Sequence, residues 1–186
     1  MSDTMAIAAD TPRTQYRPSQ RLLHWSMAIV IICALTIGLY CSYLTPGIPL
    51  RRALLDVHKS LGMAALFLIA IRLPLRLSVG EPAYQQPLSV FNHYAARGAH
   101  ILLYVLMIVM PLAGYTTSAA GGHDLPFFGL FEWPNIVPQD KGLERISAEV
   151  HHYAGYCLLA IVSLHILAAL WHHFIVKDNV MKRMTF

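Results

Sequence analysis

The chain has 186 residues, of which 56% are hydrophobic and 13% are charged, whereas a soluble domain has about 25% charged residues. A single domain of this size cannot bury so much apolar surface, so the composition excludes a soluble globular enzyme and a disordered chain. The net charge of +4 does not indicate nucleic-acid binding, because the basic residues flank apolar segments as they do in membrane proteins. We therefore predict one integral membrane domain over residues 1–186, embedded in a lipid bilayer.

Four apolar segments are long enough to cross a bilayer as helices, because each approaches the ~20 residues that a hydrocarbon core of ~30 Å requires. They cover residues 23–44, 54–75, 98–118 and 150–174. None of them alternates polar and apolar residues, as the strands of a membrane β-barrel do. The sequence therefore predicts an all-α fold, an integral membrane bundle of four helices.

The connector before the fourth span, residues 121–149, is longer than the other joints and contains several prolines. Its aromatic residues, among them Phe127, Phe131 and Trp133, are of the kind that gathers at membrane–water interfaces. We expect this connector to lie at the interface and to cap one end of the bundle.

The charges are unevenly divided between the two ends of the predicted bundle. With four spans both termini lie on one side, and that side holds nine of the 14 basic residues but only four of the ten acidic ones. The opposite side holds five basic and six acidic residues. The positive-inside rule then predicts that both termini are cytoplasmic.

Histidines within membrane spans are costly to keep there, so they indicate function. His151 and His165 are 14 residues apart in the fourth span, which on a helix corresponds to about 21 Å of rise and a return to nearly the same face. Two imidazoles at two depths suit two stacked cofactors, each of which needs a second ligand from another helix. His24 begins the first span at the depth of His165, and His58 begins the second at the depth of His151. The sequence thus predicts two haem b groups whose iron is bound by the pairs His24/His165 and His58/His151.

Glycines recur at fixed distances from these histidines. The two histidines of the outer pair are each followed by a glycine four residues later, Gly62 and Gly155. Two further glycines, Gly38 and Gly114, each lie 14 residues after a histidine. These glycines either clear the helix surface for a porphyrin or serve ordinary helix packing in the membrane.

Two other histidines are candidates for contacts near the inner haem. His172 lies seven residues after His165 and shares its face, so it either contacts a propionate or a quinone or is an interfacial histidine. His100 opens the third span without an obvious ligand partner. It is either a supporting or quinone-site residue or a packed interfacial histidine.

Six basic residues are candidates for binding anions. At the cytoplasmic end, three arginines either neutralise haem propionates, hold an anionic quinone intermediate or simply follow the positive-inside bias: Arg21, Arg72 and Arg76. On the outer side, three residues form a patch that attracts a small anion to the outer haem edge, unless the lysine merely snorkels: Arg51, Arg52 and Lys59.

Several stretches of the sequence resemble the bacterial cytochrome b561 family of four-helix dihaem membrane proteins. They are residues 21–25, 57–62, 164–165, 168–173 and 177–179, and the resemblance extends over residues 17–183. Within the family the chain is most similar to the superoxide oxidases, which pass an electron from superoxide to ubiquinone. Lys59 and the connector with Trp133 depart from the family pattern.

The resemblance implies a protein of the bacterial cell inner membrane that carries two haem b groups. It implies that superoxide is oxidised to O2 at the outer haem and that ubiquinone is reduced to ubiquinol. It places the axial ligands on His24, His58, His151 and His165, in agreement with the depth argument, and it places His172 at the quinone site.

Three alternative functions stay open. The first is a non-catalytic cytochrome b subunit that transfers electrons for a separate dehydrogenase or hydrogenase and therefore binds a protein redox partner. The second is a six-helix ascorbate-type cytochrome b561, against which the four spans argue. The third is a non-redox metal-binding membrane protein, which the cost of idle intramembrane histidine pairs disfavours.

Overall fold

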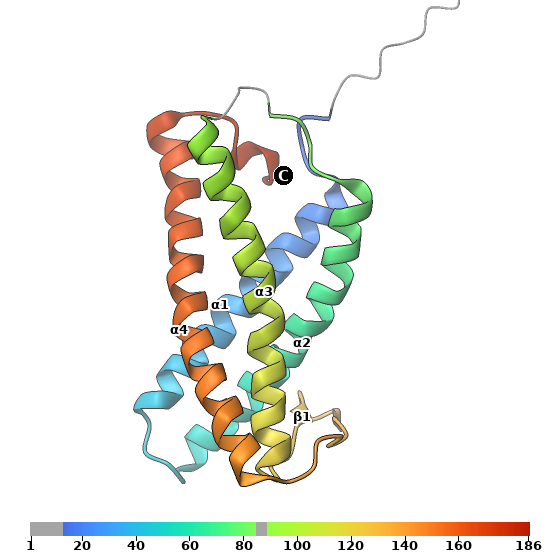
Figure 1. Ribbon diagram of the computed structural model, residues 1–186, viewed down its shortest axis with the longest axis vertical. Helices are drawn as coiled ribbons and strands as arrows, with labels where there is room; N and C mark the ends of the chain where they lie inside the picture. Colours follow the sequence, from blue (N-terminus) through green and yellow to red (C-terminus); the bar gives the residue numbers. More distant parts are fainter. Residues whose placement is uncertain (1–12, 85–88) are drawn as a thin grey trace, which may run out of the picture.

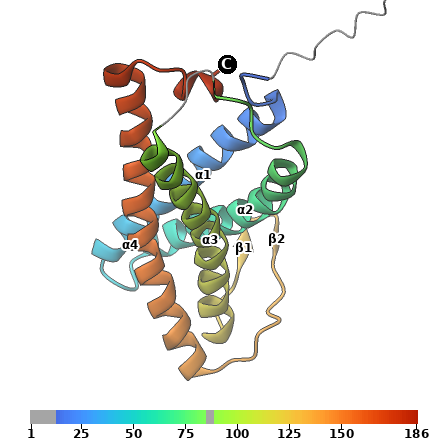
Figure 2. The ribbon, with the colours of Figure 1, turned by 45° about the horizontal axis from the view of Figure 1, so that its top comes forward.

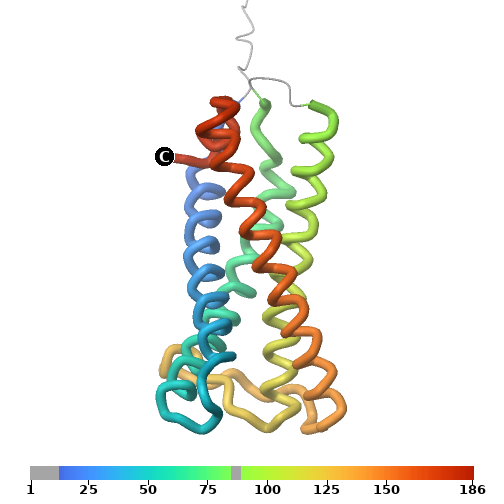
Figure 3. The backbone as a smooth tube through the Cα atoms, turned by 90° about the vertical axis from the view of Figure 1, so that its left-hand side faces the viewer, coloured from blue at the N-terminus to red at the C-terminus, as the bar shows by residue number. Residues whose placement is uncertain are grey.

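The structure, a computed structural model, describes residues 13–84 and 89–186 and is dominated by four long helices. They are α1 (Pro18–Tyr43), α2 (Pro49–Val79), α3 (Val90–Ala120) and α4 (Lys141–Trp171). The helices lie side by side with alternating chain direction (Figures 1 and 3). The predicted bundle of four helices is confirmed, and the chain is mostly helical.

All four helices are long and apolar enough to cross a membrane. In their most apolar windows only 6% to 17% of the residues are buried inside the bundle. Large side chains such as Ile29, Phe67 and Leu164 are more than 60% exposed along the helices. Such an outward apolar surface suits lipid, because lipid tails are as apolar as these side chains.

The helices pack as two hairpins. α1 packs mainly on α2, and α3 packs mainly on α4, with a smaller contact between α2 and α3. α1 and α4 make fewer contacts with each other than any of these pairs do. α1 and α4 therefore pack less closely against each other than the helices of these three pairs do.

The fourth helix begins earlier than the sequence predicted. It starts at Lys141 rather than near residue 150, because the Asp140 side chain caps it by accepting a 2.7 Å hydrogen bond from the Leu143 amide. Its first turns are polar, so a hydropathy pattern that detects only the apolar core of a span misses them. The expected connector over 121–149 therefore ends at residue 140.

The shortened connector forms a small antiparallel hairpin of β1 (Pro126–Phe127) and β2 (Phe131–Glu132). It packs against α2, next to which Figure 2 shows both strands. The Ser60 hydroxyl donates to the Pro126 carbonyl and accepts from the Phe128 amide, and the Lys59 ammonium donates to the Asp124 carbonyl at 2.7 Å. We call this end of the bundle the connector end.

The chain after α4 returns to the start of α1. A π-helical turn (His172–Val176) leads into a segment over residues 177–186, the C-terminal strap, which contains a 3-10 turn (Met181–Arg183). The Trp25 indole donates to the Met184 carbonyl at 3.0 Å, and the Tyr16 amide donates to the Arg183 carbonyl at 3.0 Å. The strap thus closes the opposite end of the bundle, the terminal end, where the C-terminus lies (Figure 1).

Candidate functional site

Two pairs of histidines face each other inside the bundle, at two depths. The rings of His24 on α1 and His165 on α4 have centroids 6.3 Å apart, near the terminal end. The rings of His58 on α2 and His151 on α4 have centroids 5.9 Å apart, near the connector end. The structure therefore brings together the same two pairs that the depth argument selected, with α4 contributing one imidazole to each.

Both rings of the connector-end pair are anchored to backbone carbonyls. His58 Nδ1 lies 2.9 Å from the carbonyl oxygen of Ala34 on α1, and His151 Nδ1 lies 2.9 Å from that of Met110 on α3. Because a carbonyl oxygen only accepts, each Nδ1 carries a proton, and in the neutral ring Nε2 keeps its lone pair. A backbone carbonyl on the second ring nitrogen is the usual way to orient a histidine that binds a metal.

Glycines make room for these two rings. A Cβ atom added to Gly38 on α1 would lie 2.8 Å from Cε1 of His58, and one added to Gly114 on α3 would lie 2.8 Å from Cε1 of His151. Each ring thus packs directly on helix backbone, one turn from its carbonyl acceptor. The sequence singled out both glycines, but it did not show that their neighbours are histidine rings.

The glycines that follow the connector-end histidines have different surroundings. A Cβ added to Gly62 would meet no atom within 4 Å, whereas one added to Gly155 would lie 3.1 Å from the Met110 methyl group. Gly62 therefore borders open space one helical turn after His58, and Gly155 serves helix packing. The role of Gly62 in clearing space for a porphyrin stays a prediction.

Buried arginine donors without partners lie near the terminal-end pair. Nη1 of Arg72 and Nε of Arg21 are fully buried and have no hydrogen-bond partner within residues 13–84 and 89–186. Elsewhere the same guanidinium groups donate to the Tyr104 hydroxyl at 3.4 Å and to the Thr185 carbonyl at 2.7 Å. Leaving a buried donor unsatisfied costs about 1–3 kcal/mol, so these N–H groups indicate an acceptor that the described residues do not supply.

These features fit a haem. Two imidazole nitrogens that each bind one metal at about 2 Å place their ring centroids roughly 6 Å apart, close to both observed separations. In the part of the chain that the structure describes, no group of three or more His, Cys, Asp or Glu side chains could hold a metal ion. Each pair therefore suits an iron whose remaining ligands come from a macrocycle, and the unpaired arginine donors suit its carboxylates.

The remaining predicted residues at the terminal end have protein partners. Arg76 forms an ion pair with Glu81 and donates to the Tyr16 hydroxyl at 3.3 Å. Burial raises the pKa of Tyr16, and the hydrogen bond and charge of Arg76 partly oppose this shift. His172 Nδ1 lies 2.5 Å from a carboxylate oxygen of Asp178, a partner that sequence reasoning did not identify.

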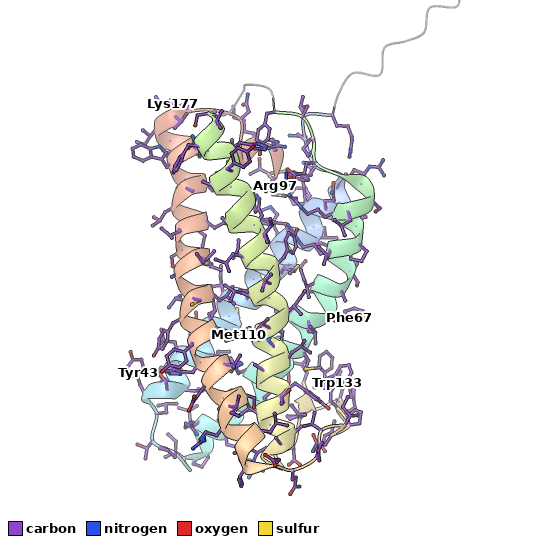
Figure 4. All side chains as sticks on the ribbon, viewed as in Figure 1. Tyr43, Phe67, Arg97, Met110, Trp133 and Lys177 are labelled. Atoms are coloured by element: carbon purple, nitrogen blue, oxygen red, sulfur yellow. The ribbon has the colours of Figure 1, made fainter. Side chains whose placement is uncertain are left out.

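The three basic residues expected to form an outer patch differ in their surroundings. Arg51 donates to the Cys41 carbonyl at 3.2 Å, and Lys59 is tied to the Asp124 carbonyl of the connector. Arg52 is exposed. Figure 4 places Trp133 at this end of the molecule, and its buried indole N–H has no partner among the described residues. Two of the three cations therefore also hold the connector end together.

Sequence reasoning missed the acceptors and supports of the site. The missed residues are Ala34, Met110, Tyr104, Tyr16 and Asp178. Only the glycines pointed toward the two carbonyls, because Gly38 and Gly114 lie one helical turn beyond them. The third histidine, His100 on α3, was a candidate without an obvious partner, and its ring centroid lies 5.7 Å from that of His165.

Four membrane-length helices with facing histidine pairs suit a membrane cytochrome of the b type, and comparison with known proteins agrees with this class. The family model for prokaryotic cytochrome b561 matches residues 15–186, so the chain belongs to this family. Membership of this family implies electron transfer in a membrane and the binding of haem b.

Individual relatives cover most of the chain. It is 27% identical to cytochrome b561 homolog 2 of Escherichia coli (strain K12), over 94% of this chain and 93% of the relative. It is 27% identical to cytochrome b561 homolog 1 of the same organism, over 91% and 96% of the two chains. It is also 29% identical to the probable superoxide oxidase CybB of Yersinia pestis, over 69% of this chain and 72% of that protein.

Proposed function

We propose that this protein holds two haem b groups and carries electrons from superoxide to ubiquinone across the bacterial cell inner membrane. The observation that carries the proposal is the placement of His151 and His165 on α4. Each of them faces a histidine of another helix, and 14 residues of helix separate the two levels by about 21 Å. A relay over such a distance suits transfer between the two membrane surfaces.

In this proposal four imidazoles would bind the two irons through Nε2: His24 and His165 at the terminal end, His58 and His151 at the connector end. Bound haem supplies one-electron redox chemistry without an open coordination position. The Ala34 and Met110 carbonyls hold the connector-end rings in the required tautomer. The buried N–H groups of Arg21 and Arg72 that no described residue satisfies would bind propionate carboxylates at the terminal end.

The terminal end faces the cytoplasm in this proposal, so both termini lie there. Basic residues gather at that end, where Figure 4 shows Arg97 and Lys177, whereas Tyr43 and Trp133 lie at the other end. This distribution supports the orientation through the positive-inside rule.

Superoxide gives up its electron at the connector end and leaves as O2. The exposed Arg52 provides positive charge near that surface, and the buried Trp133 N–H is a donor that no described residue satisfies. The relative named as a probable superoxide oxidase supports this choice of donor.

Ubiquinone is reduced at the terminal end. Two superoxide anions supply two electrons, and two protons from the cytoplasm complete ubiquinol. Nδ1 of His172 lies 2.5 Å from a carboxylate oxygen of Asp178, so Nε2 is the ring nitrogen left to take up a proton from the cytoplasm and pass it to the quinone oxygen.

The proposal is tested by the optical spectrum of the purified protein during superoxide generation by xanthine oxidase. We expect reduced b-type bands to appear, to be abolished by superoxide dismutase and to bleach when a soluble ubiquinone is added. A protein that dithionite reduces but superoxide does not would contradict the proposal and favour an electron-transfer subunit with a protein donor.

A further inference from the structure

A third imidazole lies at the level of the terminal-end pair. The ring of His100 on α3 lies 5.7 Å from that of His165, with an angle of 66° between the ring planes. The ring of His24 on α1 lies 6.3 Å from His165, with an angle of 64°. His165 therefore faces two imidazoles from two different helices in closely similar geometry.

The two imidazoles occupy equivalent positions in the two helical hairpins. His24 and His100 are each preceded, three residues earlier, by an arginine. Ten residues after each histidine lies the residue whose carbonyl accepts from a connector-end ring, and 14 residues after it lies the glycine on which that ring packs. In α1 these residues are Arg21, Ala34 and Gly38; in α3 they are Arg97, Met110 and Gly114. The two hairpins thus present matched histidines to the terminal-end level.

The second helices of the hairpins, α2 and α4, do not correspond in this way. His165 follows His151 by 14 residues on α4, whereas the residue 14 positions after His58 on α2 is Arg72. The terminal-end level therefore offers one imidazole from α4 and a choice of two partners, from α1 and from α3. At the connector end the rings of His58 and His151 contact each other, and neither contacts a further aromatic or histidine ring among the described residues.

The terminal-end rings are also less constrained than the connector-end rings. His58 and His151 are each held by a hydrogen bond at Nδ1, but the rings of His24, His100 and His165 make none with residues 13–84 or 89–186. Anchoring of the second ring nitrogen is what fixes the orientation of a ligand. A ring without it can turn at lower cost.

We propose that His100 is an alternative axial ligand of the terminal-end haem, able to replace His24 opposite His165. This inference rests on the proposed binding of two haem groups. The separations of 5.7 and 6.3 Å lie on either side of the roughly 6 Å expected for two imidazoles on one metal. Among the described residues, no group of three His, Cys, Asp or Glu side chains could hold one metal ion. His24 and His100 are therefore alternative partners of His165 and do not bind the same iron together.

The test is the haem content per chain of purified variants, with electron paramagnetic resonance to report axial ligation. We expect two haems in the wild type and in both His100→Ala and His24→Ala, the latter with an altered low-spin signal from the His100/His165 pair. The double variant His24→Ala/His100→Ala should keep one haem. The matched control His58→Ala, which has no second imidazole available, should also keep only one.

The connector-end haem serves as an internal indicator of folding in the variants altered at positions 24 and 100. A His24→Ala variant that keeps this haem but loses the other would overturn the inference, as would a double variant that keeps two. A wild type with fewer than two haems would instead overturn the proposed function on which the inference rests.

Discussion

His58 on α2 donates its Nδ1 proton to the carbonyl oxygen of Ala34 on α1, 2.9 Å away, and His151 on α4 repeats this bond to Met110 on α3. Each hairpin therefore uses the backbone of its first helix to orient a histidine of its second. The centroids of the two rings are 5.9 Å apart, and in the neutral form of each ring Nε2 carries no proton. The protein backbone alone thus orients the connector-end pair for binding an iron, independently of any contact with the rest of a cofactor.

Gly38→Ala should remove the connector-end haem. The added methyl group would lie 2.8 Å from Cε1 of His58, so the ring must turn away from its carbonyl acceptor. We expect about one haem per chain to be lost and the terminal-end haem to remain, measured by haem content and the reduced-minus-oxidised spectrum. Gly98→Ala, where a Cβ meets nothing within 4 Å, is the control. Retention of both haems in Gly38→Ala would argue against this role of the glycine.

Arg72→Met should lower the midpoint potential of the terminal-end haem. A buried positive charge favours the reduced form of a nearby haem, and Nη1 of Arg72 is buried without a partner among the residues that the structure describes. We expect a shift on the order of 60 mV, equivalent to a tenfold change in a one-electron equilibrium. A redox titration followed optically measures it, with the exposed Arg52→Met as the control. An unchanged potential would place Arg72 away from the haem.

Asp178→Asn should slow quinone reduction without affecting haem reduction by superoxide. The amide oxygen still accepts the hydrogen bond from the Val180 amide, but the variant no longer places a negative charge beside Nδ1 of His172. Loss of a positioned proton donor typically costs roughly 100-fold or more in rate. Stopped-flow reoxidation of the haems by a soluble ubiquinone measures this step, with His173→Ala as the neighbouring control. Equal reoxidation rates in wild type and Asp178→Asn would remove His172 from the proton path.

Stability at high pH should depend on Tyr16. Its pKa is raised by burial, so the folded protein keeps the phenol proton above pH 10, where the unfolded chain loses it. The stabilisation is complete below pH 10 and is lost as the pH rises through the higher pKa of the folded state. We expect the Tm of the wild type to fall more steeply above pH 10 than that of Tyr16→Phe. Parallel pH profiles of the two proteins would contradict this assignment.

The pairing of the histidines could be predicted from the sequence because helix rise converts residue number into depth. His151 and His165 differ by 14 residues, and each of their partners, His58 and His24, lies near the helix end at the same depth. The pairing required no knowledge of how the helices are arranged around the axis. Depth along a helix follows directly from position in the sequence, so this part of the site can be predicted from the sequence.

The supports of the histidines could not be predicted in the same way. Ala34 and Met110 act through backbone carbonyls, so their side chains carry no sign of the role. The approach of His100 to His165 depends on the rotation of α3 about its own axis. The early start of α4 depends on a cap at Asp140 in a polar segment, where hydropathy gives no signal.

The central claim is that electrons pass from superoxide on one side of the membrane to ubiquinone. It is tested most directly in proteoliposomes that contain ubiquinone, with superoxide generated only in the external medium and ubiquinol measured in the membrane. We predict ubiquinol formation that stops when superoxide dismutase is added outside and that is absent in liposomes carrying His58→Ala/His151→Ala. Haems that dithionite reduces, together with no dismutase-sensitive ubiquinol, would contradict the account.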